Sequence, residues 1–220
     1  MTAQPARRRA LRRVLIVVVV LAVLILAGAV AMILPILTHQ SAGGSGQQLP
    51  EGFVAETTAE GADGRTRTLS VETPAGEPAD LAQLRPGDEL VVRGTGYDPE
   101  IGIYVSICLI PSVPGDKPSP CLGGIPEGAT EADEGATRED AEPQSSVWIT
   151  DAWAWRAFAT QGYDDGESGS FTARLLVPEA AQAGLECTKS VCAVTTRADH
   201  TASADRVQDM QLPVAFARQE

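Results

Sequence analysis

Residues 101–110 read Ile-Gly-Ile-Tyr-Val-Ser-Ile-Cys-Leu-Ile, and large apolar side chains occupy every second position from Ile103 to Leu109. Successive side chains of a β-strand point to opposite faces, so this alternation predicts a strand with one buried face. The segment Gly94-Thr-Gly-Tyr-Asp-Pro99 precedes the run and predicts a turn. The stretch therefore favours a β-domain.

Shorter runs of the same kind lie on both sides of this stretch, and Gly, Pro or Asp residues separate them. The predicted strands are 53–57, 69–73, 89–94, 101–110, 168–177, 191–196 and 211–217. No segment after residue 38 shows a sustained helical period. Several short strands at this spacing predict an all-β sandwich.

The N-terminus combines positive charge with a long apolar run. Its five arginines are Arg7, Arg8, Arg9, Arg12 and Arg13. They precede 21 uncharged residues over 14–34, close to the ~20 that cross a bilayer as a helix. No acidic residue occurs before Glu51, so the positive-inside rule predicts a cytoplasmic N-terminus. We predict a basic cytoplasmic tail over 1–13 and a transmembrane signal anchor over 14–37.

A cleaved signal peptide is the alternative interpretation of this segment. Ala27-Gly28-Ala29 and Ala29-Val30-Ala31 are small-x-small sequences of the kind that signal peptidases cut. The apolar stretch continues past them to Leu37, whereas the apolar part of a signal peptide is usually about 7–15 residues long. The length favours an uncleaved anchor in a bacterial cell membrane, with the C-terminal domain extracytoplasmic.

Two regions outside the predicted strands have biased compositions. Residues 38–68 contain Ser-Ala-Gly-Gly-Ser-Gly and predict a flexible extracytoplasmic linker to an ectodomain over 69–217. Within that ectodomain, residues 111–146 predict a long acidic loop. Seven carboxylates lie in 127–142 against Arg138 alone, and the ligand order of an EF-hand is missing. A solvated loop is therefore favoured over a cation site.

Charge excludes one class of partner. Without the five N-terminal arginines the chain has 12 basic and 29 acidic residues, a formal charge of about −17. Nucleic acid is excluded as a partner, because binding it needs a basic face. The two lysines against 15 arginines are typical of GC-rich bacterial genomes.

The four cysteines are Cys108, Cys121, Cys187 and Cys192. In an exported chain they predict two disulfides, for which three pairings are possible. The spacing favours the local pairs Cys108–Cys121 and Cys187–Cys192. A metal site is the alternative, but the spacing is not that of zinc ligands and export favours oxidation.

Several motifs, spread in blocks over 69–217, carry a family resemblance. They are Leu84-x-x-Gly87-Asp88-x-x-Val91-Val92-x-Gly94-x-Gly96, then Tyr104 and Cys108, then Gly169-Ser170-Phe171-x-x-x-Leu175-x-Val177, then Cys187-x4-Cys192 and the strand 212–216. In these blocks the chain resembles the neocarzinostatin family of exported actinobacterial proteins, several of which carry an enediyne antibiotic in an apolar cleft. The resemblance implies an immunoglobulin-like antiparallel β-sandwich of about seven strands with two local disulfides.

This chain departs from that family in three ways. It has the acidic insertion, a tryptophan-rich segment and a predicted membrane anchor. A carrier that is released with a toxin is not expected to be tethered. We therefore expect this chain to share the fold and the disulfides of that family, but not its antibiotic ligand.

All three tryptophans lie close together, at Trp148, Trp153 and Trp155. In an extended strand Trp153 and Trp155 share a face and Trp148 lies on the other. Tryptophans are frequent anchors of binding surfaces, so these three are candidates for contact with a ligand or partner. The alternative is that they pack against the sandwich.

His200 is the candidate for chemistry, because Asp199 and Ser203 lie beside it. These residue types serve hydrolysis, but a triad depends on a geometry that one loop seldom supplies. No nucleophile elbow, zinc-protease motif or phosphate loop occurs. A hydrogen-bonded loop is favoured, with metal binding or hydrolysis at His200 as alternatives.

Together these observations predict a membrane-anchored, non-catalytic binding or interaction module of the bacterial cell envelope, without a cofactor or metal. Its expected partner is an envelope protein or a small apolar ligand. The alternatives are a carrier or sequestering protein for a small aromatic ligand, and an exported hydrolase or metal-binding protein that uses His200.

Overall fold

The computed structural model describes residues 4–124, 143–182 and 184–217, with side chains from residue 11 onward. The chain divides into two compact units, Met1–His39 and Gln40–Glu220. The acidic part of the predicted loop, 125–142, lies outside the described residues.

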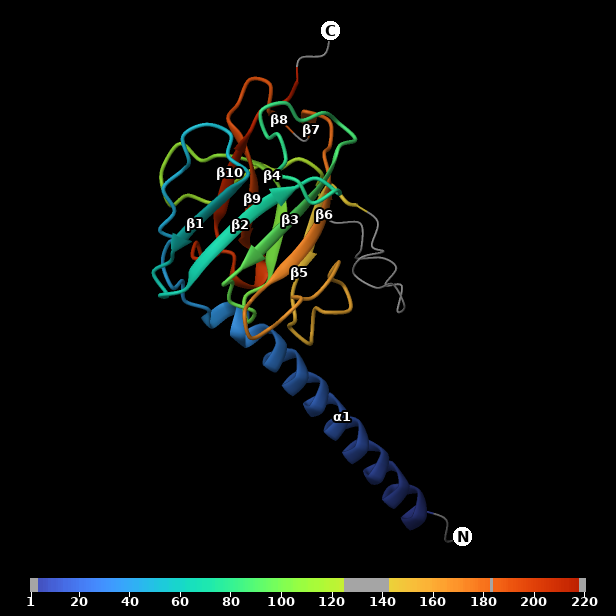
Figure 1. Cartoon of the computed structure of the whole chain (residues 1–220). Coiled ribbons are helices and arrows are strands. Elements are labelled where there is room, and N and C mark those ends of the chain that lie inside the picture. The colour runs from blue at the N-terminus through green and yellow to red at the C-terminus, as the bar shows by residue number, and fades with distance from the viewer. Residues whose placement is uncertain (1–3, 125–142, 183, 218–220) are drawn as a thin grey trace. The chain divides into compact units, whose positions relative to one another are not determined.

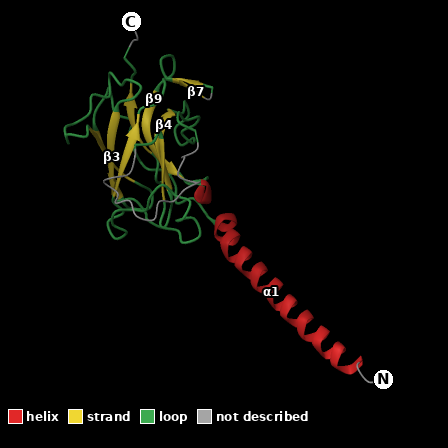
Figure 2. Cartoon of the chain, turned by 90° about the vertical axis from the view of Figure 1, so that its right-hand side faces the viewer, coloured by secondary structure: helices red, strands yellow, loops and turns green. Residues whose placement is uncertain are grey.

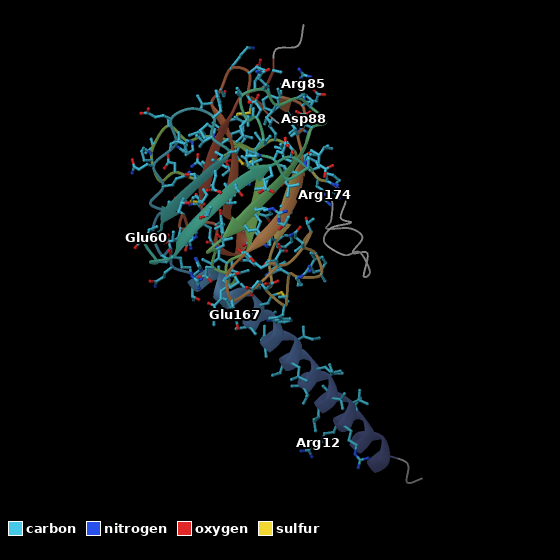
Figure 3. All side chains as sticks on the ribbon, in the orientation of Figure 1. Arg12, Glu60, Arg85, Asp88, Glu167 and Arg174 are labelled. Atoms are coloured by element: carbon cyan, nitrogen blue, oxygen red, sulfur yellow. A yellow bond between two sulfur atoms is a disulfide. The ribbon has the colours of Figure 1, made fainter. Side chains whose placement is uncertain are left out.

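The first unit is a single helix, α1 (Gln4–Thr38). By length and composition its segment Leu11–Thr38, with a mean hydropathy of 3.4, is able to cross a membrane, as an anchor or a signal sequence would. The helix starts before the predicted span and includes Arg12, which Figure 3 labels near its beginning. Arginine and alanine are good helix formers, which explains this extension into the basic tail.

The second unit consists mostly of antiparallel strands and loops (Figure 2). Its strands are β1 (Glu56–Glu60), β2 (Thr66–Glu72), β3 (Glu89–Thr95), β4 (Ile103–Leu109), β5 (Ser146–Ile149), β6 (Phe171–Leu176), β7 (Ala181–Gln182), β8 (Leu185–Glu186), β9 (Cys192–Ala198) and β10 (Met210–Val214). One four-stranded sheet has the order β1-β2-β3-β6 and another the order β10-β9-β4-β5. Strands β7 and β8 form a separate ribbon. Figure 1 shows the first sheet in front of the second.

The two four-stranded sheets share one apolar core. Leu69 and Val92 from the front sheet and Val105 and Val194 from the rear sheet are all fully buried in the same cluster. Burial alternates along β2 and β6, as a strand with one inner face requires. Burying each such side chain contributes about 1.5–3 kcal/mol, so the packing of the sheets supplies the main stabilisation.

The part of the chain that the structure describes has ten strands, whereas the sequence predicts about seven. The seven predicted strands each overlap an observed one, and β5, β7 and β8 are additional. All four residues of β5 are buried, so the strand lacks the alternation that reveals a half-exposed strand. Strands β7 and β8 have two residues each, too few for any period to show.

The outer surface of the front sheet carries ion pairs between neighbouring strands. Arg174 Nε on β6, labelled in Figure 3, donates to Glu89 Oε1 on β3 over 2.7 Å. Arg93 Nε on β3 donates to Glu72 Oε2 on β2 over 3.0 Å. These side chains are partly exposed, so each pair contributes at most about 1 kcal/mol.

Residues 40–68, which form most of the predicted linker 38–68, belong to the second compact unit. They contain β1, and Gln47 is tied to strand β10. The Gln47 amide donates from Nε2 to the Gln211 carbonyl over 2.7 Å and accepts from the Gln211 backbone N–H at Oε1 over 2.8 Å. The Ala42 N–H donates to Asp205 Oδ2 over 3.0 Å. These tertiary partners hold a segment whose composition alone predicts flexibility.

Both disulfides join the local pairs that the spacing favours, Cys108 to Cys121 and Cys187 to Cys192. The first ties β4 to the start of the acidic loop. The second closes the turn between β8 and β9, and both of its cysteines lie in the apolar core. No free cysteine occurs.

Candidate binding site

A row of large side chains crosses the outer face of the rear sheet. Tyr104 on β4 pairs in register with Trp148 on β5 and with Arg197 on β9. The neighbours of Tyr104, Ile103 and Val105, are buried in the core, so Tyr104 points away from it. The rings of Tyr104 and Trp148 lie 5.9 Å apart, and the Arg197 guanidinium lies 5.6 Å from the Tyr104 ring centre.

His200 completes an aromatic cluster at this row. Its Nδ1 is 3.0 Å from the Tyr104 hydroxyl. The ring contacts Trp148 edge to face at 5.1 Å and Trp155 at 5.0 Å with an interplanar angle of 87°. His200 itself stays exposed. Tyr104, Trp148, Trp155 and His200 are called the aromatic site below.

Asp199 fixes the position of His200. The carboxylate is fully buried and accepts from Trp148 Nε1 at Oδ2 over 2.9 Å. Its Oδ1 accepts from the Thr201 backbone N–H over 2.8 Å and from the Thr201 hydroxyl over 2.5 Å. Asp199 is thus the N-cap of the short 3₁₀ helix η3 (His200–Ala202).

Burial shifts the pKa of Tyr104 and of Arg197 in opposite directions. Burial, with the charge of Asp199 adding to it, raises the pKa of Tyr104 to about 12. Its hydroxyl is therefore protonated at neutral pH. Burial also lowers the pKa of Arg197. Arg197 Nη1 donates to the Pro118 carbonyl over 3.3 Å, while its buried Nε has no partner among the described residues.

The segment after β5 presents the other aromatic residues on a loop that is held at both ends. Thr150 N–H donates to the Gln161 carbonyl over 3.1 Å, and Gln161 N–H donates to the Trp148 carbonyl over 3.1 Å. Between them, the N–H groups of Trp155 and Phe158 close successive turns. At the surface of this loop Trp153 is 79% exposed and Phe158 is 51% exposed.

The three tryptophans therefore have different environments. Trp148 is 7% exposed and packs on the outer face of the sheet. Trp155 is half-buried against His200, and Trp153 faces solvent. The segment around Trp153 and Trp155 forms turns, so the shared face that an extended strand would give these two residues does not arise.

The structure does not assemble a catalytic triad at His200. Asp199 bonds to Trp148 and Thr201, and in the described part of the chain no hydrogen bond joins His200 to Asp199 or Ser203. Among residues 4–124, 143–182 and 184–217, no group of three His, Cys, Asp or Glu side chains is placed to hold a metal ion.

Sequence reasoning did not identify Tyr104 or Arg197 as part of the site. A signal was present for Tyr104, because it stands on the polar face of the alternating run 101–110. No local pattern marks Arg197, since only the register of β9 brings it to that row.

Comparison with known proteins gives little similarity. No protein-family model matches the chain, and no solved structure matches it. Among curated proteins, the chain is similar to thiamine biosynthesis protein X of Corynebacterium glutamicum, with 29% identity over 136 residues. The match covers 62% of this chain and 60% of the length of that relative.

Proposed function

We propose that the chain is a membrane-anchored, non-catalytic binding module of the bacterial cell envelope. In this proposal α1 anchors the chain, the arginines keep the N-terminus in the cytoplasm, and an immunoglobulin-like β-sandwich lies outside. The long apolar helix and the two disulfides support it, because disulfides persist in oxidising compartments.

The aromatic site and its neighbouring loop are the proposed contact surface for an envelope protein. The observation that carries this is the 79% exposure of Trp153 on a loop that hydrogen bonds hold at both ends. Tryptophan is among the residues that dominate binding energy at interfaces, and a preorganised loop loses little entropy when it binds. Phe158 extends the exposed apolar surface.

The test is crosslinking in intact cells followed by recovery of the chain and its partner. Wild type, Trp153→Ala and the Trp153→Ala/Trp155→Ala double variant are compared. We expect each variant to recover less partner, while Trp153→Ala keeps the melting temperature of the wild type. Val191→Ala is the matched control, because Val191 is 65% exposed and lies outside the surface. If Trp153→Ala and wild type recover equal amounts of the partner, the proposal is wrong.

A second candidate function is the carriage of a small aromatic ligand. The similarity to a protein named for thiamine biosynthesis favours it, since thiamine carries two heteroaromatic rings. A ligand that binds only the folded state raises the melting temperature, by RT ln(1 + [L]/Kd) in free energy. Thermal unfolding with and without thiamine therefore tests this candidate, and an unchanged Tm at millimolar thiamine excludes thiamine as the ligand.

A further inference from the structure

A hollow of about 490 Å³ lies on the outer face of the front sheet, over strands β3 and β6. Figure 1 shows these two strands side by side, and they pair in the sheet. The usual volume of small-molecule sites is about 300–1,000 Å³, so the hollow is large enough for a ligand. It shares no lining residue with the aromatic site.

Strand β3 forms the floor of the hollow. Glu89, Val91 and Arg93 line it, and they lie at alternate positions of the strand, so they share its outer face. Leu90 and Val92 between them are buried in the core. From Glu89 to Arg93 the strand extends over about 13 Å, at about 3.3 Å per residue. The floor is therefore elongated, with a charged residue at each end and an apolar residue in the middle.

Arg93 offers hydrogen-bond donors at one end of this floor. Its side chain is 50% exposed, so a ligand can reach the guanidinium. Nε donates to Glu72 Oε2 over 3.0 Å, and Nη1 donates to Thr172 Oγ1 over 2.9 Å. A guanidinium has five N–H groups, so three of those on Arg93 have no hydrogen-bond partner in the part of the chain that the structure describes.

Glu89 offers an acceptor at the other end of the floor. Arg174, labelled in Figure 3, directs Nε and Nη2 to the same oxygen of Glu89, Oε1, over 2.7 and 2.5 Å. Glu89 Oε2 has no partner within residues 4–124, 143–182 and 184–217, and the side chain is 26% exposed. Arg174 therefore holds the carboxylate in place and leaves its second oxygen for a ligand.

The charges in the hollow favour an uncharged ligand. Arg93 and Arg174 balance Glu89 and Asp164 in its lining. An anion would compete with the carboxylates that already pair with the arginines, and a cation would face two guanidinium groups. A hydroxyl group both donates and accepts, so hydroxyls can bond to the remaining N–H groups of Arg93 and to Glu89 Oε2 without breaking either ion pair.

We propose that this hollow binds an uncharged, extended saccharide of the β-1,4-linked class. Hydroxyls of one ring accept from Arg93, a hydroxyl of the next ring donates to Glu89 Oε2, and C–H groups near the linkage lie on Val91. The class follows from the shape of the floor, because β-1,4 linkages keep successive rings extended. No residue of the aromatic site takes part, so this proposal goes beyond the protein-binding function and is independent of it.

The test is calorimetric titration of the full chain with cellobiose and with N,N′-diacetylchitobiose. The chain is held in micelles of a detergent without a sugar headgroup, since a glycoside detergent would compete for the hollow. Permethylated cellobiose, which has the same rings without hydroxyl donors, is the ligand control. We expect saturable one-to-one binding of at least one disaccharide and none of the permethylated compound. Because the ligand is uncharged, its affinity should not change between low and high salt.

Two variants remove the two polar ends of the floor. Arg93→Met should weaken binding at least about tenfold, because it removes donors of charge-assisted hydrogen bonds. Glu89→Met should also weaken it at least about tenfold, since it removes the acceptor. Arg85→Met is the matched control and should bind like wild type, because Arg85, also labelled in Figure 3, is exposed and does not line the hollow.

Circular dichroism checks that each variant is folded, and Glu89→Met decides the outcome if Arg93→Met is not. Equal affinity in wild type and in the folded variant overturns the proposal. So does the absence of binding of both disaccharides at millimolar concentration, or binding of permethylated cellobiose as tight as that of cellobiose.

Discussion

Trp148 Nε1 donates a hydrogen bond to Asp199 Oδ2 over 2.9 Å, within the protein interior. The bond joins β5 to the residue that follows β9. It also gives a buried carboxylate one of its partners, since the others come from Thr201. The position of His200, and so the shape of the aromatic site, depends on this contact.

Two substitutions of Trp148 should separate the contribution of its hydrogen bond to the free energy of unfolding from the contribution of its ring packing. Trp148→Phe keeps an aromatic ring but leaves Asp199 Oδ2 without its donor, so we expect a loss of about 1–3 kcal/mol in the free energy of unfolding. Trp148→Ala also loses the packing and should cost about 3–5 kcal/mol. Urea unfolding followed by circular dichroism measures both. Trp153→Phe is the control and should stay within about 0.5 kcal/mol of wild type.

The buried carboxyl of Asp209 should make stability depend on pH. Burial raises the pKa of Asp209 to about 7, although Arg206 and Arg197 oppose that effect. Lys117 also interacts with the carboxylate. The folded state holds a proton that the unfolded state, with an ordinary pKa of 3.8, releases. The contribution of Asp209 to the free energy of unfolding therefore falls as pH rises from about 4 to about 7.

Asp209→Asn removes the titrating carboxyl, so the difference in melting temperature between this variant and wild type measures the effect of the carboxyl at each pH. The melting temperature of the variant relative to wild type should rise between about pH 4.5 and about pH 7.5. Asp116→Asn, at an exposed carboxyl, should show no comparable trend. A constant difference between Asp209→Asn and wild type across this range would contradict the predicted protonation.

Arg67 should be a larger contributor to stability than any surface arginine. Its side chain is fully buried, and the guanidinium bonds to Asp63 Oδ1 and Oδ2 at 2.9 and 2.5 Å and to Gln208 Oε1 at 2.8 Å. The hydrogen bond from Arg67 holds the pKa of Asp63 below its ordinary value. Arg67→Met leaves Asp63 and Gln208 without these bonds and should cost about 3–5 kcal/mol.

Arg93→Met is the matched control for this comparison. Arg93 also pairs with a carboxylate, but its side chain is 50% exposed, so its loss should cost at most about 1 kcal/mol. Chemical denaturation of both variants gives the two free energies. Similar losses in Arg67→Met and Arg93→Met would show that burial does not strengthen the Arg67 contacts.

The two disulfides should contribute unequally. Cys108 and Cys121 are 13 positions apart, and Cys187 and Cys192 are 5 apart. In the chain-entropy model, replacing the first pair by alanine costs about 3 kcal/mol and replacing the second about 2 kcal/mol. Melting temperatures of the two double-alanine variants test the order. A larger loss for the second pair would instead point to the packing of Cys187 and Cys192 in the core.

Local patterns in the sequence predict much of the β-fold. The alternation from Ile103 to Leu109 matches β4, and the spacing of the cysteines matches both disulfides. The strand β5 was not predicted, because all of its residues are buried and it lacks alternation. Gln47 gave no signal either, since its role depends on a strand more than 160 positions away.

The candidate sites are harder to predict from the sequence than the strands are, because the exposure and contacts of their residues depend on tertiary structure. Trp153 and Trp155 were recognised from residue type, but their different exposure follows from turns that the extended-strand expectation did not include. Asp209 carries no sequence motif, and its burial follows from the tertiary fold alone.

The contact between Gln47 and Gln211 has a consequence for the solution behaviour of the chain. Strand β10 is the outermost strand of its sheet, and an uncovered outer strand is a template on which a second molecule can add its own strand. The Gln47 side chain occupies the backbone N–H and carbonyl of Gln211 as a neighbouring peptide would. The segment that follows the apolar helix therefore covers the outer edge of β10 at Gln211, where it blocks the addition of a strand from a second molecule.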